Sequence, residues 1–211
     1  MTIGEVYNKY SDLYKIKRSG WIKRGINDPE SIADHELNSM LMAFMFLSEK
    51  EDSPAPDGYD KILVIELLLI HDLGENDIGD IIRGEKTKDD KERELSSIID
   101  LLTGISDHNG DKNRAATLKR LWLDMESPAP VDVNARIAKE IDYIQGAYQF
   151  FKYCVDGAYV PAAKSCAEWL EEVSDKYVKT SVGKTMRDEL ILKNELFTRD
   201  KTLGGIIRSF F

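Results

Sequence analysis

The chain has 211 residues, of which 42% are hydrophobic and 32% are charged, and its formal net charge is -9. This length and composition suffice for one large domain with a substantial core. The negative charge argues against a protein dedicated to binding nucleic acid polymers, because it offers no general counter-charge to a phosphate backbone. One small phosphate ester is not excluded, since a metal ion and a local cation are enough to hold it.

The sequence predicts a cytoplasmic protein that does not act at a membrane. Residues 1–5 contain no basic segment leading into an apolar one, so they do not resemble a secretory leader. The longest apolar run, from Ile62 to Ile70, is far shorter than the roughly 20 residues that a membrane span needs.

Hydrophobic residues recur at steps of three and four through most of the chain, which predicts an all-α fold. No stretch alternates between apolar and polar residues as a strand would. Helices are expected over residues 2–16, 30–50, 59–72, 88–103, 112–125, 131–153 and 181–197, with one more after Gly157 that runs through Trp169 to Tyr177. The polar segment 107–111 is expected to be a turn. The helix over 59–72 is apolar on nearly all sides and is therefore expected to be central.

Five cations lie within residues 15–24, with Trp21 among them. We expect a loop here. In an acidic chain this clustering indicates either a solvated basic loop with a packing tryptophan or a site for a substrate phosphate, and the sequence leaves both interpretations open.

The stretch from Ile70 to Asp80 places an imidazole and several carboxylates directly after the most apolar segment of the chain. His71 and Asp72 come first, at the expected end of a helix. Three further acids follow them: Glu75, Asp77 and Asp80. The position of these groups marks where buried structure meets chemistry. Taken alone, however, Glu75, Asp77 and Asp80 would be interpreted as capping acids in a solvated turn, so a functional site here depends on further partners for His71 and Asp72.

Two other residues are candidates to complete a site with His71 and Asp72. His35 lies early in the second expected helix, and Asp142 lies in the middle of an otherwise apolar helix face. A buried carboxylate without a partner is costly, so a cation is the economical explanation for Asp142. Two imidazoles and two carboxylates suit one first-row divalent ion such as Mn, Co, Fe, Ni or Zn. The remaining histidine, His108, lies in a polar segment and is set aside.

The order and spacing of these residues resemble those of the HD-domain metal-dependent phosphohydrolases, and most closely their 5'-deoxynucleotidase branch. The resemblance covers about residues 15–153. It rests on Arg18 to Trp21, Pro29 to His35, His71 to Ile81, Leu121 with Trp122, and Lys139 to Asp142. It implies a helical-bundle HD domain over residues 1–153 and a C-terminal helical extension over residues 154–211 that packs on the same domain.

The resemblance also implies a role for each matching position. These roles are metal ligands for His35, His71, Asp72 and Asp142, catalytic carboxylates for Glu75 and Asp80, and substrate contacts for Arg18 and Trp21. Glu75 would position or deprotonate a water molecule, and Asp80 would handle a proton or orient the sugar. Trp21 would pack on the sugar or base, and Arg18 would contact the phosphate, a role that Arg24 or Lys23 could fill instead. Asp77 is expected to be only a capping acid.

The implied activity is that of a metal-dependent phosphomonoesterase that hydrolyses deoxyribonucleoside 5'-monophosphates, with one divalent transition metal ion. The implied assembly is a homodimer, in which the apolar chain end, Ile206 to Phe211, would pack on the core or across the interface.

Two alternative functions stay open. One is another HD activity, on a cyclic nucleotide, a nucleoside triphosphate or a guanosine alarmone. The other is a non-catalytic metal-binding HD scaffold, against which intact Glu75 and Asp80 argue.

Overall fold

The fold is described by a computed structural model, which covers residues 2–47, 58–82, 84–158 and 177–199. Within these ranges the regular elements are helices, and the one strand-like pairing is an isolated bridge between Lys17 and Ser31. The expected all-α fold is confirmed. None of the described helices combines the length and the apolar character that crossing a membrane would require.

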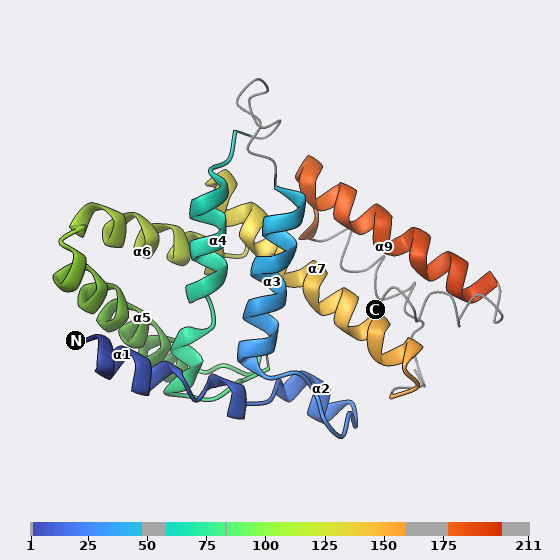
Figure 1. Ribbon diagram of the computed structural model, residues 1–211, viewed down its shortest axis with the longest axis horizontal. Coiled ribbons are helices and arrows are strands. Elements are labelled where there is room, and N and C mark those ends of the chain that lie inside the picture. Colours follow the sequence, from blue (N-terminus) through green and yellow to red (C-terminus); the bar gives the residue numbers. More distant parts are fainter. Residues whose placement is uncertain (1, 48–57, 83, 159–176, 200–211) are drawn as a thin grey trace.

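The helices follow the expected order along the chain (Figure 1). They are α1 (Ile3–Tyr10), α2 (Ser19–Lys23), α3 (Ile32–Phe46), α4 (Lys61–Ile70), α5 (Lys88–Asn109), α6 (Lys112–Glu126), α7 (Val133–Val155) and α9 (Ser181–Arg199), with 3-10 turns η1 (Leu13–Lys15) and η2 (Leu73–Asn76). Most of the helix expected between Gly157 and Tyr177 lies outside the described residues, and so does the apolar chain end.

Three expectations about local structure were wrong. The helix expected over 2–16 ends at Tyr10, because the small polar residues that follow favour a turn over a continued helix, and a 3-10 turn takes its place. The basic segment 15–24 is not all loop, since it contains the short helix α2. The turn expected at 107–111 begins later: α5 continues through Asn109 and ends where Gly110 adopts the left-handed conformation, with φ of 78°.

Helix α7 forms the centre of the bundle and contacts α3, α4, α6 and α9 (Figure 1). Helix α4 packs against α3, α6 and α7 through buried Val64, Leu67 and Leu68. Its burial is one-sided, however, because Ile62 and Leu69 on the same helix are about half exposed. Helix α4 therefore packs among three other helices, but part of its apolar surface is not covered.

Side-chain caps fix where the three helices around the centre begin. Ser31 and Asp34 form a reciprocal capping box at the start of α3, while Asp60 and Asp132 cap α4 and α7. Because these starts are fixed, the first turn of α3, the end of α4 and the middle of α7 meet at one place in the bundle.

Glu140 on α7 holds the start of α9 in place. Its buried carboxylate accepts hydrogen bonds from the backbone N–H of Lys179 at 2.8 Å and of Thr180 at 3.1 Å, and from the Thr180 hydroxyl. Gly183 permits this approach, since a Cβ there would lie 2.1 Å from a carboxylate oxygen of Glu140. The start of α9 is thus tied to α7 by a polar contact within the core.

We expect Glu140→Ala to lower the free energy of unfolding by about 2–4 kcal/mol, because the buried donors of Thr180 and the part-buried N–H of Lys179 lose a charged acceptor. The control Glu92→Ala removes an exposed carboxylate that pairs with Lys88 on α5, and should change stability by less than about 0.5 kcal/mol. Urea unfolding measures both values. A loss below about 1 kcal/mol in Glu140→Ala would show that this contact does not anchor α9.

Candidate metal centre

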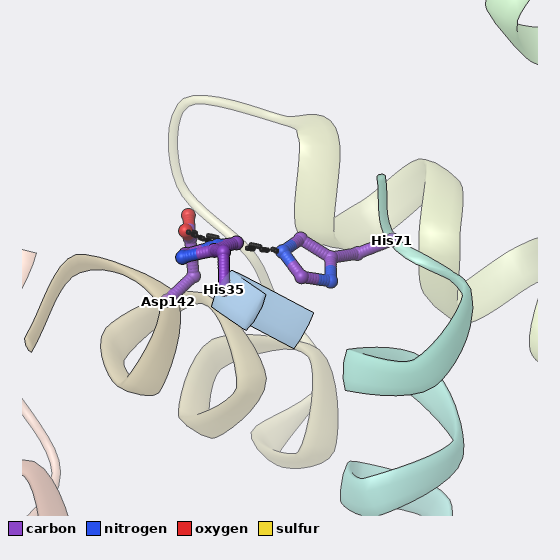
Figure 2. Close-up of side chains that lie close together, drawn as sticks. All are labelled: His35, His71 and Asp142. Atoms are coloured by element: carbon purple, nitrogen blue, oxygen red, sulfur yellow. Dashed lines mark hydrogen bonds and ion pairs between the residues drawn. The ribbon is translucent and has the colours of Figure 1, made fainter. Parts of the chain in front are cut away.

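His35, His71 and Asp142 come from three different parts of the chain and meet at one point (Figure 2). His35 lies in the first turn of α3, His71 directly follows α4, and Asp142 lies midway along α7. The two Nε2 atoms are 3.2 Å apart, and Asp142 Oδ1 lies 3.1 Å from that of His35 and 3.9 Å from that of His71. All three side chains are buried. Their donor atoms are close enough to hold one metal ion.

Both imidazoles are oriented by hydrogen bonds at their Nδ1 atoms. His71 Nδ1 lies 2.8 Å from the carbonyl oxygen of Leu68, an acceptor, which assigns the proton to Nδ1. His35 Nδ1 lies 2.6 Å from Oε1 of Gln145, whose amide nitrogen donates to Glu30. With these tautomers, the two Nε2 lone pairs face each other. A shared cation satisfies both lone pairs, whereas two unprotonated nitrogens have no hydrogen bond to share.

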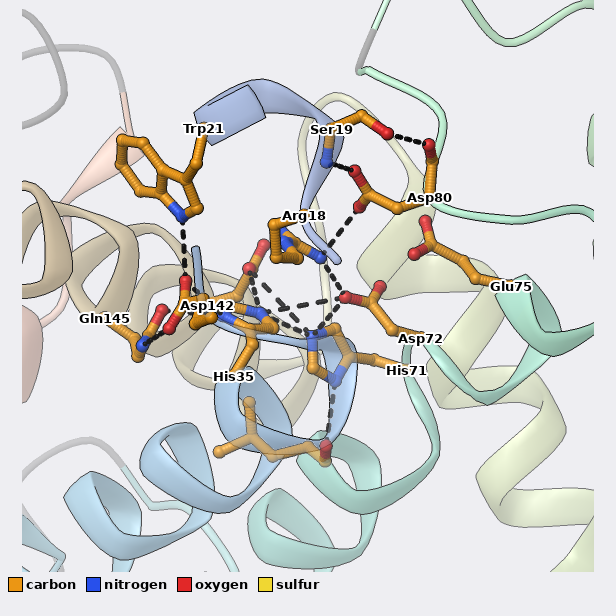
Figure 3. Close-up of polar contacts among 12 residues, drawn as sticks. Arg18, Ser19, Trp21, His35, His71, Asp72, Glu75, Asp80, Asp142 and Gln145 are labelled. Carbon is orange, nitrogen blue, oxygen red and sulfur yellow. Dashed lines mark hydrogen bonds and ion pairs between the residues drawn. The ribbon is translucent and has the colours of Figure 1, made fainter. Parts of the chain in front are cut away.

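A chain of buried hydrogen bonds runs from His35 through Gln145 and Glu30 to Trp21, on the side of the imidazole opposite Nε2 (Figure 3). Trp21 Nε1 donates to Glu30 Oε1 at 3.0 Å, and Gln145 Nε2 donates to Glu30 Oε2 at 2.9 Å. Sequence reasoning gave no role to Glu30 or Gln145. The available signal for Gln145 was its spacing, because a residue three positions after Asp142 lies on the same face of a helix.

The charges around His35 favour a cation at this point. Burial and the nearby Arg18 guanidinium lower the pKa of His35, but the carboxylates of Asp142 and Asp72 outweigh them, so that the pKa is raised. The negative field that favours a proton on this imidazole equally favours a divalent cation beside it. The donor set and its field therefore both fit a metal ion.

Asp72, the fourth expected ligand, lies at the edge of this cluster (Figure 3). Its Oδ2 is 3.4 Å from His71 Nε2 and 3.7 Å from His35 Nε2, and only 2.5 Å from Arg18 Nη1. Burial raises the pKa of Asp72, but His71, Arg18 and His35 outweigh burial and bring it to about 2. This carboxylate is therefore ionised and is shared between the imidazoles and the guanidinium.

Arg18 and Asp80 are brought to the site as expected, but they also bind each other. Arg18 Nη1 lies 3.3 Å from Asp80 Oδ1, and Asp80 Oδ2 accepts a hydrogen bond from the backbone N–H of Ser19 at 2.5 Å. Burial opposes the charge on Arg18, but Asp72 and Asp80 outweigh it and hold the guanidinium pKa above its ordinary value. The Asp80 carboxylate thus fixes the segment that carries Arg18.

Glu75, in η2, is a buried carboxylate with one oxygen held and one without a partner. Lys86 Nζ lies 3.0 Å from Oε1 and bridges to Glu94 at 2.7 Å. Oε2 has no hydrogen-bond partner among the described residues. Burial raises the pKa of Glu75 well above its usual range, and the negative charge of Asp72 adds to this effect. Sequence reasoning did not anticipate Lys86, because its segment reads as a charged surface connection.

The other cations and acids of these segments lie further from the centre. Lys23 pairs with Glu85 at 2.6 Å, and both side chains are exposed. Asp77 pairs with Lys9 of α1 at 2.7 Å, so it links α1 to the segment after η2 and is more than a capping acid. His108 is exposed near the end of α5.

The metal cluster opens into a cavity of about 550 Å³, a size typical of small-molecule sites. The cavity wall combines site residues with a set of cations: Arg18, Arg24, Lys86, Lys91 and Lys139. Trp21 also lines it, although only 7% of this residue is exposed. The arrangement offers a metal centre, a guanidinium and a buried carboxylate to one small anionic ligand.

Comparison with known proteins finds one matching family and several similar proteins. The pattern of a family described as "HD domain" matches residues 10–174. The chain is 31% identical over 153 residues to the 5'-deoxynucleotidase HDDC2 of Dictyostelium discoideum, which covers 71% of this chain and 76% of that protein. It is 29% identical over 142 residues to the protein of the same name from Danio rerio, covering 67% and 64% of the two chains.

Among solved structures, a conserved hypothetical protein from Pyrococcus furiosus shares the fold. Its TM-score is 0.63 at 21% identity, and the match covers 88% of this chain and 97% of that one. A predicted metal-dependent phosphohydrolase from Magnetospirillum magnetotacticum gives a TM-score of 0.57 at 22% identity, covering 88% and 87%. At these identities the likeness concerns the fold alone.

The support behind His35 leads to a prediction about metal affinity. Gln145→Leu should weaken binding of Mn²⁺ or Zn²⁺ by about 10- to 100-fold, because His35 loses the acceptor that fixes its tautomer and ring orientation. The control Asn113→Leu changes an exposed amide in the first turn of α6 and should bind metal like the wild type. Isothermal titration measures both. Equal affinities in the two variants would refute a supporting role for Gln145.

Proposed function

The chain belongs to the HD-domain family, and from that premise we propose that it is a phosphomonoesterase that hydrolyses deoxyribonucleoside 5'-monophosphates to deoxynucleoside and phosphate. The observation that carries this proposal is the buried His35–His71–Asp142 cluster, which shares one cavity with Arg18 and Glu75. The 5'-deoxynucleotidase names of the relatives support the substrate class. We also propose that the protein acts in the cytoplasm.

We propose that one divalent transition metal ion (Mn, Co, Fe, Ni or Zn) is held by His35, His71 and Asp142, with Asp72 as the fourth ligand. Such an ion supplies Lewis-acid chemistry, since it polarises a phosphoryl oxygen and lowers the pKa of water. His71, Arg18 and His35 hold the pKa of Asp72 at about 2, so Asp72 would offer the ion a carboxylate. The ligand set is made of borderline N and O donors, which is the set expected for these metals.

Arg18 is proposed to bind the substrate phosphate. Its guanidinium already lies between two carboxylates, Asp72 and Asp80, at the edge of the metal cluster. A phosphate group is a bidentate acceptor of the kind that a guanidinium prefers, so it competes well for these N–H donors. Asp80 would keep Arg18 aimed at the phosphate, in addition to the proton or sugar contact expected for it.

Glu75 is proposed to position or deprotonate the attacking water. Its Oε1 is fixed by Lys86, while Oε2 has no partner among the described residues and the side chain lines the cavity. A carboxyl group with a raised pKa exchanges a proton more readily near neutral pH than an ordinary glutamate. Lys86 would then limit how far the carboxylate can turn during the reaction.

A second candidate is another HD activity, on a nucleoside triphosphate, a cyclic nucleotide or an alarmone. Arg24 and Lys91 favour it, because both line the cavity and neither pairs with a carboxylate within the described ranges.

A phosphate-release screen separates the two candidate activities. It tests deoxy- and ribonucleoside mono- and triphosphates and cyclic nucleotides, each in the presence of Mn, Co, Mg or Zn. Preferred release from deoxynucleoside monophosphates supports the proposal. No release from any of these compounds would favour a non-catalytic scaffold.

Glu75→Gln tests the proposed chemistry. The variant should lose at least about 100-fold in kcat, because an amide cannot take a proton from water, and it should still bind metal. The control Asp77→Asn, two residues further along and paired with Lys9, should keep wild-type turnover within about threefold. Steady-state phosphate release and elemental analysis give the two readouts. Equal hydrolysis by Glu75→Gln and the wild type would refute the mechanism.

We further propose a homodimer that pairs through α3 and α4, which lie side by side (Figure 1). Exposed apolar side chains at helical spacing cover this face: Leu37, Leu41, Phe44 and Met45 on α3, and Ile62 and Leu69 on α4, each 46–69% exposed. Large apolar side chains exposed in this number on two adjacent helices indicate a surface that another molecule covers. Two-fold pairing would bury the same face on both copies.

Leu41→Glu should shift the protein from dimer to monomer, because it places a charge in the proposed interface. The control Leu123→Glu, on α6, changes a leucine that is similarly exposed, at 44%, and should leave the mass unchanged. Light scattering after size exclusion measures both. A monomeric wild type, or a dimer that survives Leu41→Glu, would contradict pairing through this face.

A further inference from the structure

Trp21, expected to pack on the sugar or base, already has its ring surface occupied. Phe150 stacks parallel to the indole at 6.1 Å between centroids, and Tyr153 meets it edge-on at 5.4 Å. The Arg24 guanidinium lies over the same ring at 5.4 Å. With 7% of the residue exposed, Trp21 has little ring surface left for a nucleobase. A nucleobase that stacks in this cavity needs another aromatic surface.

Tyr143 and Tyr177 supply such a surface. Their rings stack with centroids 3.9 Å apart and an interplanar angle of 20°. Both line the same cavity as the metal cluster, and both are partly exposed. Tyr143 follows Asp142 directly on α7, whereas Tyr177 belongs to the segment that leads into α9. The pair therefore joins two distant parts of the chain at the cavity wall.

One face of α7 connects the metal centre to this tyrosine pair. Lys139, Asp142, Tyr143 and Gly146 follow the helical spacing of three and four residues, and all four line the cavity. Gly146 lies about 6 Å further along the helix than Asp142. Gly146 has no side chain, so it contributes only backbone to the cavity wall beside Tyr143.

We propose that the Tyr143–Tyr177 pair, with Gly146 beside it, is the surface on which the heterocyclic ring of the substrate stacks. This inference rests on the proposed function, because it places the phosphate at the metal centre and the ring at the other end of the α7 face. Stacking on an aromatic face tolerates any base, since every base has a π surface. The site should therefore accept purine and pyrimidine deoxynucleotides with similar affinity.

The test compares a nucleotide with the same molecule without its base. Binding of deoxyadenosine 5'-monophosphate and of 2-deoxyribose 5-phosphate is measured by isothermal titration, and turnover of both by phosphate release. In Tyr177→Ala, the ratio of nucleotide affinity to sugar-phosphate affinity should fall about tenfold or more. Tyr177→Phe keeps the ring and should keep the ratio. Tyr7→Ala, which removes an exposed tyrosine on α1, should keep it as well.

The outcomes separate this inference from the proposed function. A ratio unchanged in Tyr177→Ala overturns the inference, even if the wild type hydrolyses the nucleotide. A wild type that binds both compounds but hydrolyses neither overturns the proposed function, while the affinity ratio still decides the inference. A wild type that does not prefer the nucleotide to the sugar phosphate overturns the stacking surface directly. Tyr143→Ala provides a second variant if Tyr177→Ala does not fold.

Discussion

Two buried imidazole nitrogens that face each other across 3.2 Å, with the Asp142 carboxylate beside them, are the constraint on which the site depends. Burial of polar atoms is costly unless they are paired, and these nitrogens have their other ring positions committed to Leu68 and Gln145. A cation between them would accept both lone pairs and balance the charge of the carboxylate. The cluster therefore accounts for why three helices converge here with their polar residues turned inward.

The polar groups around the centre form two supporting sets. One set, Glu30 and Gln145, fixes the orientation of His35 from the core side. The other, on the cavity side, is the ion-pair group of Arg18 with Asp72 and Asp80. The first set keeps the His35 imidazole rigid, and the second keeps the Arg18 guanidinium at the wall of the cavity. Helix α7 carries Asp142 of the metal centre and also part of the cavity wall, so it contributes to both parts of the proposed site.

Helical periodicity and the order of the polar residues were enough to predict the all-α fold and to single out the residues that meet at the centre. Contacts between distant segments were not predictable in this way. Glu30 and Gln145 are 115 residues apart, and nothing local marks them as partners. The stacking of Trp21 on Phe150 likewise depends on how α2 packs against α7, which no local pattern shows. Local rules also misplaced the end of α5, because Gly110 rather than the polar residues before it stops the helix.

The metal content of the purified protein tests the proposed centre most directly. Elemental analysis of the wild type, after equilibration with Mn²⁺ or Zn²⁺ and removal of free ions, should give one divalent ion per chain. Asp142→Ala should give none, because it removes the carboxylate that both imidazoles share. An unchanged metal content in Asp142→Ala would contradict the proposed centre.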